Sequence, residues 1–391
     1  MLAGIGVHWQ RIAVPFEYPV FFTRHAFATS NPDLVDAITR SEPDRRHRLL
    51  AIIDDGVAAA WPGLAAAING YVEHFGGRLV LAAEPLVVAG GERAKNDPAA
   101  LVALHARLHA LGFDRQSVVV VIGGGALLDM VGYAAATAHR GVRIVRIPTT
   151  VLAQNDSGVS VKNGVNAFGA KNFLGTFAPP FAVLNDAAFL TTLPARDTIA
   201  GMAEALKVAL VRDAEFFAWN ETHAELLAAS DLALVSEQVE RAARLHLAHI
   251  AESGDPFELG SARPLDFGHW AAHKLEMLTE HRLRHGEAVS IGMALDTCYA
   301  AEIGLLPVAT RDRILGLLAT LGLPIWDVTL RLLGPDERPL LLDGLAEFRE
   351  HLGGELTVTL LADVGRGVEV HDMRDDAILR AIDHLAARNG R

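Results

Sequence analysis

Two almost wholly apolar runs in the first half of the sequence restrict its fold more than any other feature. Residues 48–54 lead into Asp54-Asp55-Gly56, and residues 117–122 lead directly into three glycines, Gly123 to Gly125. Unbroken apolar runs of this length are typical of parallel strands that are buried on both faces. Helix-length segments alternate with these runs, and a third run follows at residues 142–147. The alternation predicts an α/β domain with a mostly parallel, Rossmann-like sheet.

The length of the chain and a change of pattern after residue 192 predict two domains. At 391 residues the chain exceeds the usual size of a single core. We expect residues 1–192 to form the α/β nucleotide-binding domain, with residues 12–23 as a strand or hairpin. Later segments repeat Ala, Leu, Glu and Arg at helical spacing, so residues 193–391 should form a mostly α-helical domain. A short strand is expected there at residues 356–361.

Composition excludes several classes of protein. The net charge of −12 argues against a nucleic-acid partner, because phosphates require a basic face. The single cysteine, Cys298, cannot form an internal disulfide and is expected in the core. No uncharged apolar window is long enough to span a membrane, and no basic segment precedes a long apolar stretch at the N-terminus. We therefore expect a cytoplasmic protein without a membrane partner.

The triple glycine is a candidate phosphate-binding turn. Gly123 to Gly125 lie where a strand meets a helix, so bare backbone amides could approach a pyrophosphate. The pattern is not the Gly-x-Gly-x-x-Gly fingerprint, and a tight turn without a ligand would have the same sequence. Asp54 ends an earlier strand, where a carboxylate could bind a ribose hydroxyl.

Residues 149–180 have many small and polar side chains and few long apolar runs. Amides and charged groups concentrate there, in Asp156, Lys162, Asn166, Lys171 and Asn172. Such a set suits a phosphorylated, hydroxyl-rich ligand. We interpret the segment as an active-site loop without regular structure, with a solvated surface loop as the alternative.

A cluster of histidines between Arg263 and Glu287 suggests a metal site. It contains His269, His273, His281 and His285. On a helix, His269 and His273 would project from one face, and Glu276 would continue that face. Imidazoles are common metal ligands, but the same residues could be ordinary polar groups at a helix edge.

Taken together, these features resemble the 3-dehydroquinate synthase superfamily of sugar phosphate cyclases. The resemblance extends from about Asp54 to about Gly354 and rests on the order and spacing of several motifs. These are Gly123-Gly-Gly-x-x-x-Asp129, Arg140-Gly141, Pro148-Thr-Thr150, Asp156 through Lys162, Lys171-Asn172, Ala203-Glu204-x-x-Lys207, Phe267-Gly268-His269 with His273, and His285-Gly-Glu287. The resemblance implies an active site between two domains, a homodimer, bound NAD and one divalent metal ion, zinc or cobalt.

The resemblance also implies roles for particular residues. The metal ligands would be Glu204, His269 and His285, although Glu204 and Lys207 alone would suggest only a surface ion pair. The NAD contacts would be Asp54, Glu92, Lys95, Gly124, Gly125, Asp129, Thr149, Thr150, Asp156, Lys171 and Thr192. The groups that act on substrate would be Asp156, Lys162, Asn172, Lys207, Asp266 and His273, with Arg140 reaching the phosphate bound by a neighbouring subunit.

The reaction implied is a multistep cyclisation at one site. A secondary alcohol of the sugar is oxidised transiently with NAD, and the metal stabilises the negative charge that develops. Phosphate then leaves by β-elimination, the hydride is returned, and an intramolecular aldol reaction closes a carbocycle.

Departures from the family pattern bear on the substrate. In 3-dehydroquinate synthase an arginine and a lysine hold the substrate carboxylate, and those places hold Ala262 and Ala248 here. Arg263 is displaced by one residue, and His351 is the uncertain substitute for a phosphate-binding lysine. Asp266 replaces an asparagine. Loss of both cations favours a ketose phosphate without a carboxylate, such as sedoheptulose 7-phosphate.

Three alternatives to this substrate choice remain open. 3-Dehydroquinate synthase itself would follow if Arg263 kept the ancestral role. The metal-dependent alcohol and glycerol dehydrogenases share the fold and would make the protein an oxidoreductase. A nucleotide-binding scaffold without catalysis is the third. His273 also departs from the 2-epi-5-epi-valiolone synthases, which lack a histidine at that place, so a separate secondary-metabolic branch is expected.

Overall fold

A parallel sheet organises the first half of the chain in this computed structural model, which describes residues 7–252, 255–257, 264–335, 337–351 and 353–389. The strands follow the order β1-β9-β6-β5-β2-β3, and β4 pairs with the last residues of β2. Every pair in this sheet is parallel. The strands are β1 Val20–Thr23, β2 His47–Asp54, β3 Leu79–Leu81, β4 Leu86–Val88, β5 Val118–Gly123, β6 Arg143–Pro148 and β9 Ala182–Asp186.

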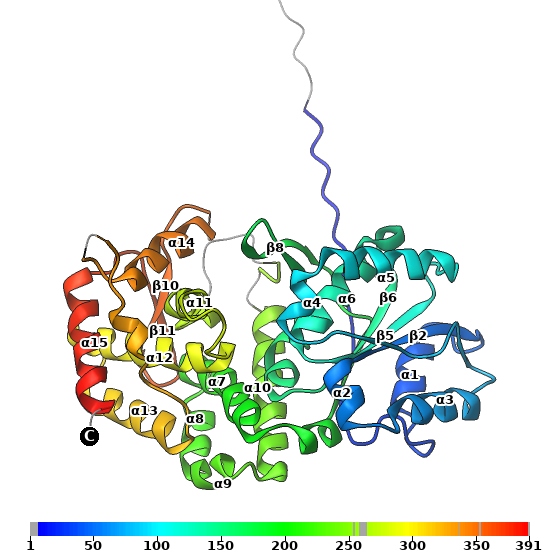
Figure 1. Ribbon diagram of the computed structural model, residues 1–391, viewed down its shortest axis with the longest axis horizontal. Helices are drawn as coiled ribbons and strands as arrows, with labels where there is room; N and C mark the ends of the chain where they lie inside the picture. The colour runs from blue at the N-terminus through cyan, green and yellow to red at the C-terminus, as the bar shows by residue number, and fades with distance from the viewer. Residues whose placement is uncertain (1–6, 253–254, 258–263, 336, 352, 390–391) are drawn as a thin grey trace, which may run out of the picture.

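Helices cover both faces of the sheet (Figure 1). Leu34, Ile38 and Ile68 of α1 and α3 pack on one face, while Leu104 and Leu127 of α5 and α6 pack on the other. These helices are α1 Asp33–Thr39, α2 Asp55–Ala60, α3 Leu64–His74, α4 Glu92–Asn96, α5 Pro98–Ala110 and α6 Gly125–Thr137. The two apolar layers confirm the predicted α/β class.

The second half of the described chain is mostly helical, as predicted. Its helices are α7 Ala195–Arg212, α8 Ala214–Thr222, α9 Ala224–Ala228, α10 Leu232–Glu252, α11 His269–Leu278, α12 His285–Glu302, α13 Val308–Thr320, α14 Asp343–His351 and α15 Asp375–Asn389. A hairpin of β10 Val358–Asp363 and β11 Arg366–Val370 follows, and β10 overlaps the strand expected at residues 356–361. In Figure 1, α10 lies between this half and the sheet. The domain boundary at residue 192 remains a prediction.

Two sequence expectations were wrong in detail. Only Val20–Thr23 of residues 12–23 forms a strand, because Pro15 and Pro19 lack the N–H group that a ladder requires. Residues 149–180 contain regular structure, a π-helical turn at Ala153–Ser157 and an antiparallel hairpin of β7 Lys162–Ala167 and β8 Ala170–Phe177.

The β7–β8 hairpin turns at Phe168 and Gly169, which both have positive φ angles of 52° and 78°. Positive φ at both central residues is the conformation that two-residue hairpin turns favour. Gly164 pairs with Gly175 across the hairpin, so the alternation that usually identifies a strand is interrupted. The sequence therefore looked like a loop.

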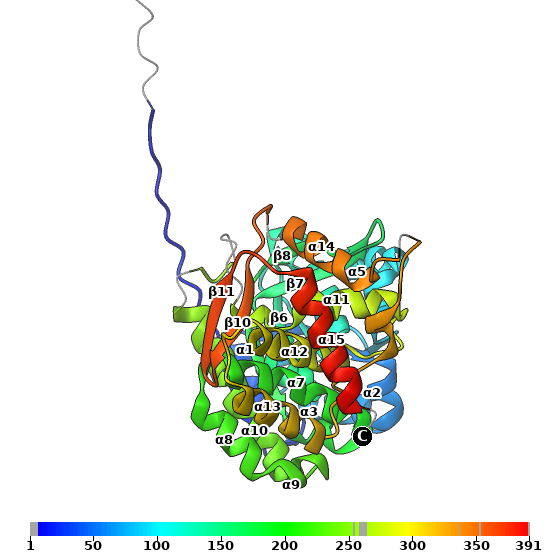
Figure 2. The same cartoon turned by 90° about the vertical axis from the view of Figure 1, so that its left-hand side faces the viewer.

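Helix α12 lies in the middle of the helical half, with α15 in front of it in Figure 2. Two of its glycines allow close approach of other backbone segments. A Cβ atom on Gly286 would lie 1.8 Å from the carbonyl oxygen of Ala200, and one on Gly292 would lie 2.0 Å from that of Gly268. These contacts set the distances from α12 to α7 and to the turn before α11.

Asp296 of α12 ties the first turn of α11 in place. Its Oδ2 accepts a hydrogen bond of 3.0 Å from the Gly268 amide, and its Oδ1 accepts one of 2.8 Å from Trp270 Nε1. Gly268 has a φ of 80°, which only glycine adopts readily. The start of α11 is therefore held by both backbone conformation and hydrogen bonds.

We predict that Gly292→Ala destabilises the protein by about 1–3 kcal/mol, because the added methyl group overpacks the contact with Gly268. Urea unfolding followed by circular dichroism would measure the change. Gly316→Ala is the matched control, since that helical glycine of α13 has nothing within 4 Å of the added Cβ. Alanine there should raise stability by up to about 1 kcal/mol. Equal effects of both substitutions would contradict the packing argument.

Candidate active site

Helix α7 buries a carboxylate and an ammonium group on one face. Glu204 and Lys207 are each 3% exposed, and Lys207 Nζ forms an ion pair with Glu204 Oε2. Burial disfavours both charges, but their mutual attraction outweighs it, lowering the pKa of Glu204 and raising that of Lys207. The surface position that their spacing suggests is therefore wrong. Within the described residues, Glu204 Oε1 has no hydrogen-bond partner of good geometry, so a further cation would stabilise it.

Two histidines face that oxygen from the first residues of separate helices. His269 begins α11 and His285 begins α12, and their Nε2 atoms lie 3.6 Å and 3.3 Å from Glu204 Oε1. Their Nδ1 atoms face the carbonyl oxygen of Phe267 and Oε2 of Glu276, each at 3.3 Å. Acceptors at Nδ1 hold the proton there and leave the Nε2 lone pair directed at Glu204.

These three side chains fit a metal ion. One ligand atom from each of Glu204, His269 and His285 lies within 4.8 Å of the others. Nitrogen and oxygen ligands about 2.0–2.1 Å from a tetrahedral zinc ion would be about 3.3 Å apart, close to the separations observed. Three protein ligands leave one position open, as catalytic zinc sites do. His273 is outside this group, and its ring centre lies 5.4 Å from that of His269.

A cavity of about 530 Å³ next to this trio is lined by five of the eleven expected NAD contacts. His285 lines it, so the cavity adjoins the metal-binding group. The predicted residues on its wall are Asp54, Gly124, Thr149, Thr150 and Thr192. Helix α6 starts beside it at Gly125 without a side-chain cap, which leaves backbone amides available for an anion.

Asp54 stands at the end of β2, at the carboxyl edge of the sheet. Burial raises the pKa of its carboxyl group, although hydrogen bonds from the Gly56 and Val57 amides oppose this. A Cβ atom on Gly90 would lie 1.8 Å from Asp54 Oδ2, so only glycine fits there. Close packing holds this carboxylate where a cofactor ribose is expected.

Four other expected cofactor residues, Glu92, Lys95, Asp129 and Lys171, form ion pairs and do not line this cavity. Lys95 Nζ lies 2.6 Å from Asp129 Oδ2. Lys171 Nζ lies 2.8 Å from Glu276 Oε1 and 3.9 Å from Glu92 Oε1. Lys171 thus contacts α11 directly, which the sequence did not indicate.

Two of the expected substrate-binding groups, Asp156 and Asp266, lie near Lys207. Asp156 Oδ2 is 3.7 Å from Lys207 Nζ, and its Oδ1 is 3.0 Å from His246 Nδ1. Burial opposes the charge of Asp266, but the nearby His269, Lys162 and Lys207 lower the pKa of its carboxyl group.

His273 and Asn172 complete the expected substrate-binding set. Burial lowers the pKa of His273 to about 4, despite the opposing charge of Glu276. Asn172 lies on β8 with a φ of 52°, and its amide donates to Asn166 Oδ1. Substrate contacts for these groups remain predictions.

Arg140 lies far from the glycine-rich turn. It follows the C-terminal end of α6, whose 13 residues begin at the glycine turn. With a rise of about 1.5 Å per residue, about 20 Å separates the two ends of the helix. Arg140 is therefore too far away to contact a ligand bound at that turn within the same subunit.

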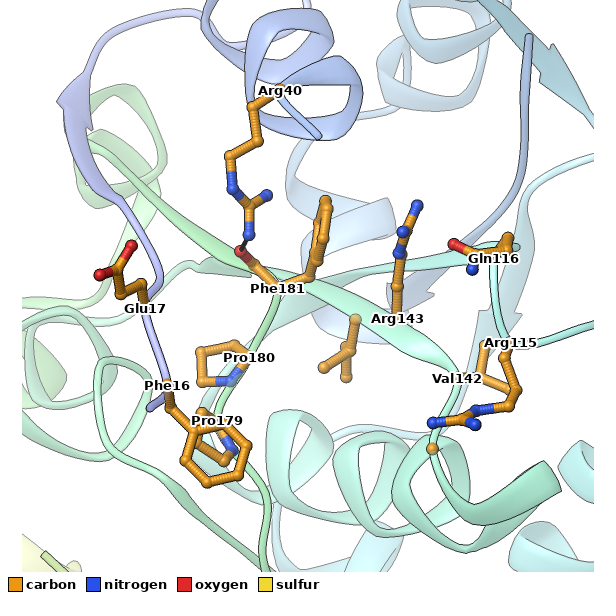
Figure 3. A pocket seen from close by; sticks show the side chains of 12 residues that line it. Phe16, Glu17, Arg40, Arg115, Gln116, Val142, Arg143, Pro179, Pro180 and Phe181 are labelled. Atoms are coloured by element: carbon orange, nitrogen blue, oxygen red, sulfur yellow. Dashed lines mark hydrogen bonds between the residues drawn. The ribbon is translucent and has the colours of Figure 1, made fainter. Parts of the chain in front are cut away.

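A second cavity, of about 470 Å³, lies at the amino ends of the strands (Figure 3). Arg40 and Arg143 line it and stack on Phe181. Arg40 donates to the Phe181 carbonyl oxygen, and Arg143 forms an ion pair of 2.8 Å with Glu42. Phe181 and Glu42 already bind these two guanidinium groups. This cavity is therefore a poorer candidate for the active site than the cavity beside Glu204, His269 and His285.

Sequence reasoning did not assign several residues of the cleft. Trp61, Gly201 and Arg284 line the cofactor cavity, and no sequence signal pointed to them. His246, which lies 3.0 Å from Asp156, is a further unassigned residue. Ala262 and Arg263 lie outside the described residues, and His351 is the last residue of α14.

Comparisons with known proteins agree with this arrangement. Residues 85–200 match the model of the 3-dehydroquinate synthase N-terminal domain, and residues 201–335 match that of the C-terminal domain. A 2-epi-5-epi-valiolone synthase of Streptomyces glaucescens is 37% identical over 285 residues, which cover 72% of each chain. The chain belongs to the 3-dehydroquinate synthase family. A 3-dehydroquinate synthase of Ruegeria sp. (strain TM1040) is 35% identical over 91% of this chain and 94% of that protein.

Solved structures of family members have the same fold. ValA, a 2-epi-5-epi-valiolone synthase from Streptomyces hygroscopicus subsp. jinggangensis 5008 with NAD+ and Zn2+ bound, is 32% identical with a TM-score of 0.84, and the match covers 97% of this chain and 100% of that one. A 2-deoxy-scyllo-inosose synthase complexed with carbaglucose-6-phosphate, NAD+ and Co2+ is 25% identical with a TM-score of 0.72, over 93% and 96% of the two chains. None of the helices in the described residues is long and apolar enough to cross a membrane.

We predict that His285→Ala abolishes stoichiometric zinc binding, because it removes one of three protein ligands. Elemental analysis after dialysis against dilute zinc would measure the metal content. His273→Ala is the matched control, since His273 is a neighbouring histidine outside the ligand group, and it should keep the metal. Full metal content in the His285 variant would contradict the ligand set.

Proposed function

We propose that this protein is an NAD- and metal-dependent sugar phosphate cyclase whose substrate is a ketose phosphate without a carboxylate, such as sedoheptulose 7-phosphate. The main support is that the Glu204–His269–His285 group shares His285 with the wall of the cavity beside the glycine-rich turn. A substrate hydroxyl group in the open metal position could thus lie next to a nicotinamide ring. Zinc or cobalt suits this donor set.

When bound, NAD takes up and returns a hydride, and the metal ion stabilises negative charge on a substrate oxygen. The residues of the chain hold the substrate for these steps. Lys207 stays protonated between Glu204 and Asp156, so it can donate a hydrogen bond to a substrate hydroxyl group. His273 is neutral near pH 7, because burial lowers its pKa to about 4, and its ring N–H can donate a hydrogen bond to a phosphate oxygen. Lys162 provides positive charge at the start of β7.

We propose a homodimer in which Arg140 binds the phosphate at the partner's site. Arg140 lies beyond the C-terminal end of α6, whereas the cofactor cavity adjoins the N-terminal end of that helix. An exposed arginine with a positive φ of 61° at such a turn is well placed for contact with another subunit.

The substrate proposal rests on charge. Ala248 occupies the place of the carboxylate-binding lysine, and the histidines beside it on α10 are uncharged at neutral pH. Burial lowers the pKa of His249 to about 4, with help from Arg212, and burial also lowers that of His246. Asp266 is ionised near Lys162 and Lys207. A substrate carboxylate would lack its partners here and would be repelled by Asp266, whereas a neutral hydroxymethyl group would not.

The alternative within the family is 3-dehydroquinate synthase itself, which acts on a carboxylated heptulosonate phosphate. It is favoured by the 35% identity to a Ruegeria 3-dehydroquinate synthase along 91% of this chain. Ala248, His246 and His249 of α10 argue against it, because none of them provides a positive charge for a substrate carboxylate.

We predict that phosphate release from sedoheptulose 7-phosphate requires NAD only in catalytic amounts, because each turnover returns the hydride. Phosphate release would be measured by a coupled assay and NADH by its absorbance at about 340 nm. Many turnovers of phosphate should occur without a lasting rise in NADH. NADH formed in step with substrate consumption would indicate a dehydrogenase instead.

We also predict a higher kcat/KM for sedoheptulose 7-phosphate than for the carboxylated heptulosonate phosphate. The double variant Ala248→Lys with Asp266→Asn should shift the ratio at least about tenfold toward the carboxylated substrate, since it adds a cation and removes an anion. Ala251→Lys is the control, because it adds the same charge to an exposed position of α10. A wild-type preference for the carboxylated substrate would support the alternative.

A further inference from the structure

Glu276 is a buried carboxylate between the candidate metal site and the sheet half of the molecule. Its side chain is 3% exposed, and it extends from α11 two helical turns after His269. Oε2 lies 3.3 Å from His285 Nδ1, and Oε1 lies 2.8 Å from Lys171 Nζ. One carboxylate therefore contacts both a metal-ligand candidate and a lysine of another element, although it is not part of the ligand group itself.

The contact with His285 has a physical function if His285 binds a metal through Nε2. A carboxylate that accepts the Nδ1 proton fixes the orientation of the ring and makes Nε2 a better ligand. The position of Glu276 consequently affects the geometry of the metal site. Lys171 helps to set that position, because its ammonium group compensates the buried charge of Glu276.

Lys171 belongs to the β7–β8 hairpin, residues 162–177, which packs on α4 and α6 of the sheet half. The hairpin begins at Lys162 and also contains Asn172, so it includes two expected substrate-binding residues. Lys171 extends from it to α11, and about one third of its side chain is exposed. The bond from Lys171 to Glu276 thus connects the hairpin with the helix that begins at His269.

We infer that Glu276 is a positioning residue that couples the seating of the β7–β8 hairpin to metal binding through Lys171 and His285. This inference rests on the proposed metal site. When Lys171 contacts Glu276, the carboxylate is held against His285 and the metal is bound more tightly. Coupling between two equilibria is reciprocal, so the metal must in turn favour the seated hairpin.

Zinc affinity, measured by competition with a chromophoric chelator at fixed pH, tests the first half of this inference. Glu276→Gln should weaken zinc binding about 10- to 100-fold, as loss of such hydrogen-bond partners does, and Glu276→Asp should partly restore it. Lys171→Met should weaken binding by a smaller factor, and the double variant should be no weaker than Glu276→Gln alone. The matched control is Glu347→Gln, which breaks another contact of α11, the pair of Lys274 with Glu347 of α14, and should not change zinc affinity.

Hydrogen exchange of the hairpin amides tests the second half and does not depend on catalysis. Zinc should slow exchange in residues 162–177 of the wild-type protein and of Glu347→Gln. It should have little effect on these amides in Lys171→Met at a zinc concentration that saturates that variant. The Lys171 side chain is only partly buried, so we expect Lys171→Met to fold normally. This variant therefore tests the coupling even if Glu276→Gln folds poorly.

The outcomes separate this inference from the proposed function. If wild-type protein binds zinc, but Lys171→Met has the same affinity and the same zinc-dependent protection of the hairpin, the coupling is wrong while the metal site stands. If wild-type protein binds neither zinc nor cobalt, the proposed function and the coupling both fail.

Discussion

Burial of the Glu204 carboxylate is the constraint on which the cleft depends. An ionised carboxylate inside a protein is strongly unfavourable unless positive groups compensate it. Lys207 compensates one oxygen from the same helix, and the other oxygen faces two imidazole rings. The two imidazole rings can face this oxygen only if α11 and α12 lie close to α7. Backbone contacts at Gly286 and Gly292 and the hydrogen bonds of Asp296 hold these helices together.

The sequence predicted the sheet well because its signals are local. The unbroken apolar runs became β2, β5 and β6, and Asp97 caps α5 by accepting hydrogen bonds from the Ala99 and Ala100 amides. The hairpin at residues 162–177 could not be predicted, because its paired glycines and polar side chains remove the alternation that identifies a strand. Its existence depends on a turn at Phe168 and Gly169 and on packing against α6.

Local sequence patterns could not predict which histidines belong to the metal-binding group. Spacing on a helix relates His269 to His273, but it says nothing about which imidazole faces a carboxylate on another helix. That choice is made by the close approach of α12 to α7, which places His285 against Glu204. The likeness to a known family suggested the trio, and the geometry of the described residues is consistent with it. The burial of Glu204 and Lys207 could not be predicted from the sequence either, because a three-residue spacing is compatible with both a surface position and a core position.

Helix α10 contributes to only one end of the cleft. It places His246 beside Asp156, and it carries Ala248 and His249 nearby. Among the described residues, neither the metal-binding group nor the lining of the cofactor cavity includes any residue of this helix. Under the proposed function, the helix that carries the place of the carboxylate-binding lysine is thus separate from the residues that would hold the metal ion. Under that proposal, substitutions on α10 and at Asp266, just before α11, would change which substrate is accepted, while the metal-binding residues on α7, α11 and α12 stay the same.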